Sequence, residues 1–423
     1  MRIAENKKRC FEMNSLKEKA EEIGKKRKGA FLPIFLCWFA YMSAYAGRYS
    51  YPASIVAIEE AFSVTHSQSG LVTTCFFFAY GIGQVVNGIL CKRYNRHLII
   101  ALVLFVSSAI NFSTFLGIPF VYLKYIWLLN GVFQSMLWSS IILTLSENLE
   151  SENLTKAVIA MSFSIATGTL SVYGFSSLMS LVGDYTYTFL FSAALMAAAA
   201  LCWTFGYKKA YREANKKETV NKSVQTRQKA DASLVVVIVM LATLAIANNL
   251  VKDGITTWLP SILKEQFGLP QALSIVLALV LPIMGMFGAV CNVNMRKRIS
   301  SFLSISGIWY FIASAGLALV ILFLKLNVWY LALLFFALIA LSMHGANNLI
   351  TGIVPLYMRT KINSGLLAGL MDGFCYVGST ISSYGLGLIA DNFGWNGVLV
   401  LLLCVCVFSV AVSFLGRHNK SAN

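Results

Sequence analysis

Long apolar segments follow one another along almost the whole chain, and each is long enough to cross a lipid bilayer. A transmembrane helix needs about 20 apolar residues. Inside lipid every backbone amide and carbonyl must bond within the protein, so only helices and closed β-barrels can span it. The segments lack the two-residue alternation of barrel strands, and the sequence therefore predicts an all-α membrane protein.

The composition of the chain supports this class and argues against others. Charged residues make up 12% of the sequence, whereas soluble domains carry about 25%. The nine cysteines and four histidines are scattered, so we expect no disulfide, metal site or cofactor. No nucleophile–base pair or phosphate-binding loop is recognisable, and an enzyme is therefore not expected.

Twelve transmembrane spans are predicted, six on each side of a polar, lysine-rich stretch. They lie at 31–58, 67–90, 98–116, 120–146, 156–181, 186–207, 233–262, 270–293, 300–323, 328–355, 363–390 and 395–416. The chain thus divides into a basic tail (1–30), a six-helix bundle (31–207), a linker (208–232), a second six-helix bundle (233–416) and a final tail (417–423). This layout is typical of transporters built from two repeated halves.

The net charge of +16 is concentrated on one side of the predicted membrane. The tails, the linker and alternate loops hold most of the 34 lysines and arginines. Cytoplasmic loops carry such an excess, so both termini are predicted to be cytoplasmic in a plasma or inner membrane. The same placement makes the bilayer, and not nucleic acid, the expected partner of these charges.

The main charged residues inside the predicted spans are Arg48, Lys252, Asp253 and Asp372. Each costs about 2.5–3.5 kcal/mol to insert, so each requires a functional or structural reason. Arg48 and Lys252 lie in the first span of each half and would face each other across a central cavity. Two cations repel unless an anion lies between them, which favours a clamp for a small anionic substrate. The alternative is that a structural acid neutralises each cation.

Polar and aromatic residues with helical spacing surround these charges. Tyr41, Tyr45 and Arg48 are spaced i, i+4 and i+7, so they share one helix face. Similar spacing places the following residues on shared faces of the second and fourth spans: Tyr80 and Gln84, then Asn130, Gln134 and Trp138. We interpret these as walls of a substrate cavity. Hydrogen bonds between helices are the alternative, and for Asn130 the two readings are balanced.

The order and spacing of four segments resemble the organophosphate:phosphate antiporters of the major facilitator superfamily. The segments are Tyr41–Arg48, Gly131–Trp138, Lys252–Pro260 and Ala368–Gly397, the last containing Tyr376. The resemblance implies a major facilitator fold and alternating access around a central phosphate site. It also implies exchange of a phosphorylated sugar or glycerol phosphate for inorganic phosphate, and a monomer.

Three positions depart from members of that family that bind glycerol phosphate. Gln84 stands where they have a lysine, Thr167 aligns with a histidine, and Lys252 replaces a substrate-binding arginine. Lysine lacks the planar fork with which arginine holds phosphate. A proton-coupled symporter of hexuronate or a similar carboxylate is therefore one alternative. A non-transporting membrane sensor of such a ligand is another.

The two acids bear on that choice. If Asp253 faces a neighbouring helix, the cavity keeps about two positive charges and suits a phosphate dianion. If Asp253 or Asp372 faces the cavity, one charge is offset and a carboxylate monoanion fits better. An embedded acid of this kind can also carry a coupling proton.

Two further expectations concern loops and glycines. Lys92 and Arg93 after the second span, together with Glu147 after the fourth, are predicted to form a cytoplasmic latch. The alternative is that these cations only set the topology. Gly369, Gly373 and Gly378 are expected to allow close packing of helices and not to contact a ligand.

Overall fold

The computed structural model describes residues 2–90, 93–149, 151–211, 232–358, 362 and 364–416, and all regular structure in these residues is helical. The first half of the chain contains α1 (Arg2–Phe62), α2 (His66–Leu90), α3 (Arg96–Phe115), α4 (Phe120–Asn148), α5 (Ser151–Val182) and α6 (Thr186–Tyr211). The second half contains α7 (Ala232–Phe267), α8 (Gln271–Leu277), α9 (Val280–Arg296), α10 (Phe302–Lys325), α11 (Trp329–Asn347), the π-helical turn η1 (Asn348–Ile353), α12 (Val354–Tyr357) and α13 (Ser364–Gly416).

Ten helical segments within the described residues are long and apolar enough to cross a membrane. One of them runs through α8 and α9, and another through α11 and η1. α13 contains a non-helical residue, Gly394, with φ 68° and ψ 179°. A side chain is disfavoured at this positive φ, and glycine lacks one, so the chain turns there. α13 therefore consists of two helical stretches joined at Gly394.

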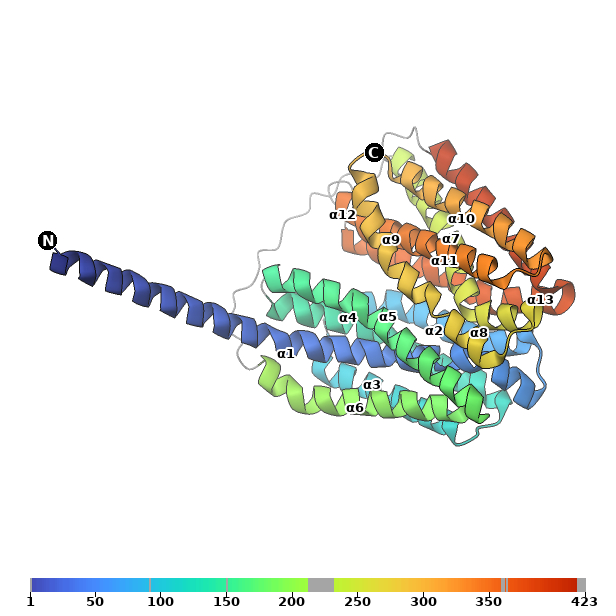
Figure 1. Cartoon of the computed structure of the whole chain (residues 1–423), viewed down its shortest axis with the longest axis horizontal. Helices are drawn as coiled ribbons and strands as arrows, with labels where there is room; N and C mark the ends of the chain where they lie inside the picture. Colours follow the sequence, from blue (N-terminus) through green and yellow to red (C-terminus); the bar gives the residue numbers. More distant parts are fainter. Residues whose placement is uncertain are drawn as a thin grey trace.

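The helices form two bundles, α1–α6 and α7–α13, which Figure 1 shows as a blue-to-green group and a yellow-to-red group. Within the first bundle α1 packs on α5 and α6, and α2 packs on α4. Within the second, α7 packs on α13, and α10 on α11. The bundles meet where α13 runs along α2 and where α5 contacts α8 and α9.

Side-chain contacts between the bundles gather near one end of the molecule, which we call the distal end. There Lys264 forms an ion pair with Glu60, and the Ser177 hydroxyl donates a 2.8 Å hydrogen bond to the Ala272 carbonyl. Backbones also approach closely, because a Cβ added at Gly70 would lie 2.4 Å from the carbonyl oxygen of Ser383. Towards the ends of α6 and α7 that flank residues 212–231, the bundles diverge (Figure 1).

Candidate functional site

Arg48 lies inside the molecule on α1 and is 6% exposed. Its guanidinium carbon is 4.6 Å from the ring centre of Tyr45 and 4.2 Å from that of Tyr80. Phe76 lies 5.1 Å away. Aromatic faces attract cations at these distances, and more strongly where water is excluded. Three rings therefore stabilise the buried charge, and Arg48 forms no ion pair with any acid in the described part of the chain.

Hydrogen bonding leaves most of the guanidinium free. The Nε of Arg48 donates to the Gln134 side-chain oxygen over 3.4 Å, and Gln134 donates in turn to Asn130 over 3.2 Å. Arginine carries five N–H donors. Within the described residues, Gln134 accepts a hydrogen bond from one of these donors. The remaining N–H donors can therefore bind an anion.

The rings of Tyr45, Phe76 and Tyr80 form what we call the aromatic cage of Arg48. The other aromatic residues predicted for the site extend this cage. The Tyr41 ring lies 5.0 Å from Tyr45 and 4.8 Å from Trp138. The Tyr376 ring, from the second bundle, lies 4.6 Å from Tyr80. The Gln84 amide donates a 2.8 Å hydrogen bond to the Tyr80 hydroxyl. The structure thus brings residues of α1, α2, α4 and α13 together around Arg48.

Lys252, on α7, is paired with its neighbour. Its ammonium nitrogen lies 3.5 Å from one carboxylate oxygen of Asp253. The other Asp253 oxygen accepts hydrogen bonds from the Ser379 hydroxyl and, over 3.2 Å, from the Asn249 amide. Asp253 therefore faces α13 and also offsets the charge of Lys252, which combines the two arrangements that the sequence left open.

The fields of both cations reach the same interior region. Arg48 and Lys252 each act electrostatically on Tyr45 and on Asp372. Asp372 is half-buried on α13, one turn before Tyr376, and forms no hydrogen bond or ion pair within the described residues. Within the described residues it thus differs from Asp253, which has an ion pair and two hydrogen bonds.

Two predicted groups are not joined to this cluster by any described contact. The Thr167 hydroxyl donates to the Phe163 carbonyl of its own helix over 2.8 Å. Glu147 forms its ion pair with Arg96, while Arg93 is exposed. Lys92 lies outside the described residues. The ion pair formed by Glu147 therefore differs from the predicted latch, and the pairing with Lys92 stays a prediction.

Sequence reasoning missed the polar partners of Asp253, the acid that pairs with Lys252. Asn249 precedes Asp253 by one helical turn, and that spacing was the available signal. Ser379 lies 126 residues further along the chain, so its contact with Asp253 required the fold. His344, one of the four scattered histidines, lines a small cavity beside Lys252.

A second missed cluster, at the distal end, is centred on His66. Its Nδ1 lies 3.1 Å from Glu59 of the same bundle, and its Nε2 lies 3.3 Å from Glu265 of the other bundle. The backbone N–H groups of His66 and Ser67 both donate to Asp391 over 2.9 Å. Both ring nitrogens must donate to satisfy two carboxylates, so this imidazole is protonated.

The sequence profile of the Major Facilitator Superfamily matches residues 37–364. A probable hexose phosphate transport protein of Chlamydia pneumoniae is 22% identical over 442 residues, covering 96% of this chain and 94% of the relative. The glycerol-3-phosphate transporter of Bacillus subtilis is 24% identical over 430 residues, covering 91% and 90%.

A solved structure shares the architecture. It is a bacterial homologue of the human lysosomal transporter Spinster in an inward-facing and unoccupied conformation. The TM-score is 0.76 with 14% sequence identity, over 93% of this chain and 98% of that one. The likeness shows a common fold.

Proposed function

The chain belongs to the major facilitator superfamily and is a multi-pass membrane transporter, and we propose that it carries a small organic anion by alternating access around Arg48 and Lys252. The proposed cargo is a phosphorylated sugar or glycerol phosphate, exchanged for inorganic phosphate. The two relatives that align along nearly their whole length are named as hexose phosphate and glycerol-3-phosphate carriers. Their names support the choice of a phosphate ester.

The observation that carries this proposal is the cage around Arg48. A buried guanidinium suits an oxyanion when it has free donors, rings of Tyr45 and Tyr80 beside it and no acidic partner among the described residues. Tyr376 of the second bundle packs on Tyr80. The described residues contribute a net charge near +1 from Arg48, Lys252 and Asp253 together. A phosphate oxygen can also bind the Lys252 ammonium in place of Asp253. The Asp253 carboxylate then keeps its hydrogen bonds from Ser379 and Asn249.

We further propose that the protein lies in the plasma membrane. It would cross this membrane twelve times, with both termini in the cytoplasm. Ten segments meet the length and hydropathy requirement; α1 and the second stretch of α13 would supply the other two. In this topology a cytoplasmic linker joins the bundles 31–207 and 233–416. The distal end lies away from that linker and is therefore extracellular. The contacts at that end then make this conformation inward-facing.

Proton-coupled symport of a carboxylate such as hexuronate is the second candidate. The offset of Lys252 by Asp253 favours it, because the remaining charge matches a monoanion. The half-buried Asp372 supplies an acid that can hold a proton beside the cargo. In this scheme phosphate is not a counter-substrate.

Counterflow in proteoliposomes tests these proposals. Vesicles loaded with inorganic phosphate should accumulate labelled phosphate, and external glycerol-3-phosphate or glucose-6-phosphate should compete. Uptake of labelled glucuronate that follows an imposed proton gradient and ignores internal phosphate would support symport instead. Phosphate-ester binding without any flux would point to a sensor.

The topology is tested separately, in a variant that lacks the native cysteines. Leu326→Cys, in the turn between α10 and α11, should react with an impermeant maleimide in intact cells. Ser300→Cys, between α9 and α10, should react only after permeabilisation. Labelling with the opposite sidedness would reverse the proposed orientation.

A further inference from the structure

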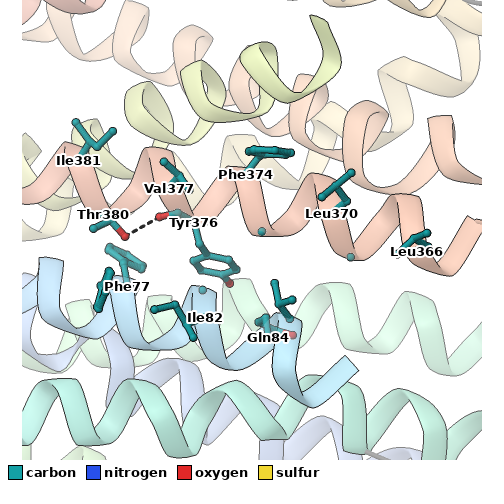
Figure 2. A pocket seen from close by; sticks show the side chains of 15 residues that line it. Phe77, Ile82, Gln84, Leu366, Leu370, Phe374, Tyr376, Val377, Thr380 and Ile381 are labelled. Carbon is teal, nitrogen blue, oxygen red and sulfur yellow. Dashed lines mark hydrogen bonds between the residues drawn. The ribbon is translucent and has the colours of Figure 1, made fainter. Parts of the chain in front are cut away.

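A large groove lies between α2 and α13, with side chains of both helices along its walls (Figure 2). Its volume is about 650 Å³. Its walls are mostly apolar: Ile82 and Val85 line it from α2, and Leu370, Val377 and Ile381 line it from α13. Both helices belong to the membrane-crossing segments, and the lining residues Ile82, Val85 and Leu370 are exposed apolar side chains, so we expect this groove to face the hydrocarbon of the bilayer.

The inner wall of the groove is polar and touches the anion site. Gln84 and Tyr376 line the groove, and Gln84 donates to the Tyr80 hydroxyl over 2.8 Å. The Tyr80 ring lies 4.6 Å from Tyr376 and 4.2 Å from the Arg48 guanidinium carbon. One aromatic layer therefore separates an apolar groove from a buried cation that has no acidic partner among the described residues.

Glycines keep the groove open along α13. A Cβ added at Gly369 would meet no atom within 4 Å, and one added at Gly373 would meet only Val85 at 3.4 Å. Gly378 differs, because a Cβ there would lie 2.1 Å from the Ile246 carbonyl oxygen. Close helix packing thus explains Gly378 but not the other two, contrary to the expectation from sequence. Gly369 and Gly373 instead leave space.

From this continuity we infer that the protein binds anionic amphiphiles, with the head group on Arg48 and the hydrocarbon chain in the groove between α2 and α13. Alkyl phosphates are the simplest members of this class. Tyr80 and Tyr376 part to let the chain pass, as two rings from different bundles can when the bundles move. The inference rests on the proposed role of Arg48 in anion binding and extends the cargo class from phosphate esters of sugars to those with tails.

Displacement of labelled inorganic phosphate from the protein in nanodiscs tests chain-length dependence. Ethyl, butyl, octyl and decyl phosphate should bind about fourfold more tightly for each methylene buried, the fold-change that corresponds to ~0.8 kcal/mol per CH₂. Concentrations are corrected for partition into the disc, and alkyltrimethylammonium ions of equal length are the control. Corrected affinities that do not depend on chain length would overturn the inference.

Two variants fill the groove from opposite sides. Gly369→Leu enters open space on α13, and Ile82→Trp enlarges an exposed side chain on α2. Each should leave phosphate affinity within about twofold and weaken decyl phosphate at least tenfold. The matched control is Gly174→Leu on α5, where an added Cβ also meets nothing within 4 Å. Unchanged decyl phosphate binding in both groove variants contradicts the inference.

Photolabelling separates this inference from the proposed cargo. Decyl phosphate with a diazirine in its tail should label groove residues such as Phe374, and Arg48→Gln should reduce this labelling at least fivefold. Labelling that persists in Arg48→Gln would show ordinary lipid solvation and overturn the inference. If sugar phosphates fail to bind but Arg48-dependent labelling remains, the proposed cargo is wrong and the amphiphile site stands.

Discussion

The Nε2 of His66 lies 3.3 Å from a carboxylate oxygen of Glu265, and this contact joins the two bundles at the distal end. The ring also packs 4.9 Å from Trp395, whose indole N–H donates to Glu265 over 2.8 Å. Alternating access requires the distal end to open, so this contact must break once in each cycle. The His66 ring is therefore part of a gate in the proposed mechanism.

Replacing His66 by Gln should favour the distal-open conformation. The neutral amide loses the charge-assisted bonds to Glu59 and Glu265, while the backbone bonds to Asp391 remain. Glu265 is 39% exposed at its side chain, so screening limits the effect to about 1 kcal/mol, or roughly fivefold in population. Distances between spin labels on the distal ends of α2 and α8 would measure the shift. An unchanged distribution would mean that other contacts hold the gate.

Arg48→Lys should reduce phosphate counterflow by more than tenfold, whereas Lys252→Arg should retain at least a third of it. The first change removes a planar fork that holds an oxyanion, and the second adds one. Initial rates in matched proteoliposomes measure both. Equal tolerance of the two substitutions would count against Arg48 as the principal anion ligand.

Asp253→Asn should distinguish antiport from symport. The amide can still interact with Ser379 and Asn249 but no longer offsets the Lys252 charge. For a phosphate antiporter we expect phosphate binding to tighten by about three- to tenfold. The substitution removes the repulsion between the Asp253 carboxylate and phosphate, which costs about 1 kcal/mol. For a proton symporter, in which Asp372 holds the coupling proton, we expect proton-driven uptake to persist in Asp253→Asn and to be lost in Asp372→Asn. Ser379→Ala, which keeps the carboxylate, is the control.

Gly70→Val should prevent the distal end from closing. An added Cβ would lie 2.4 Å from the Ser383 carbonyl oxygen, a backbone atom that cannot move aside. We expect transport to fall below a tenth while the protein still folds in the distal-open form. Gly385→Ala is the matched control on α13, since its Cβ would meet only Ile381 at 3.6 Å. Maleimide labelling of a cysteine at Thr74 reports the opening.

Charge reversal tests the latch. Glu147 pairs with Arg96 in this conformation, so Arg96→Glu should slow transport by no more than about threefold, as for a partly exposed pair. Adding Glu147→Arg should restore the rate. If Lys92→Glu abolishes transport and Glu147→Lys does not rescue it, the predicted pairing of Lys92 with Glu147 is wrong.

Local periodicity explains which parts of the site sequence reasoning could predict. Tyr41, Tyr45 and Arg48 share a helix face by spacing alone, and their rings and guanidinium are in contact. The apolar segments likewise predicted an all-helical membrane protein, because lipid permits few other solutions.

Contacts between distant segments explain what it could not predict. The gate combines Glu59, His66, Glu265 and Asp391 from four helices. Glu59 and His66 are seven residues apart, but α1 ends between them at Phe62, so helical periodicity does not predict their contact. The groove depends on which face of α13 lies against α2. A glycine at position 369 in the sequence does not indicate that face. Spacing could not show that Asp253 bonds to Ser379 while it also pairs with Lys252.

The aromatic cage of Arg48 has a consequence for turnover. If Arg48 were paired with a carboxylate, that carboxylate would have to leave before each cargo bound and return after each release. It would add a step to the transport cycle and would compete with the cargo for the guanidinium. Ring faces do not compete with the cargo, since their attraction for the guanidinium does not use its N–H donors. One anion can therefore replace another at Arg48 without rearranging an internal counter-ion.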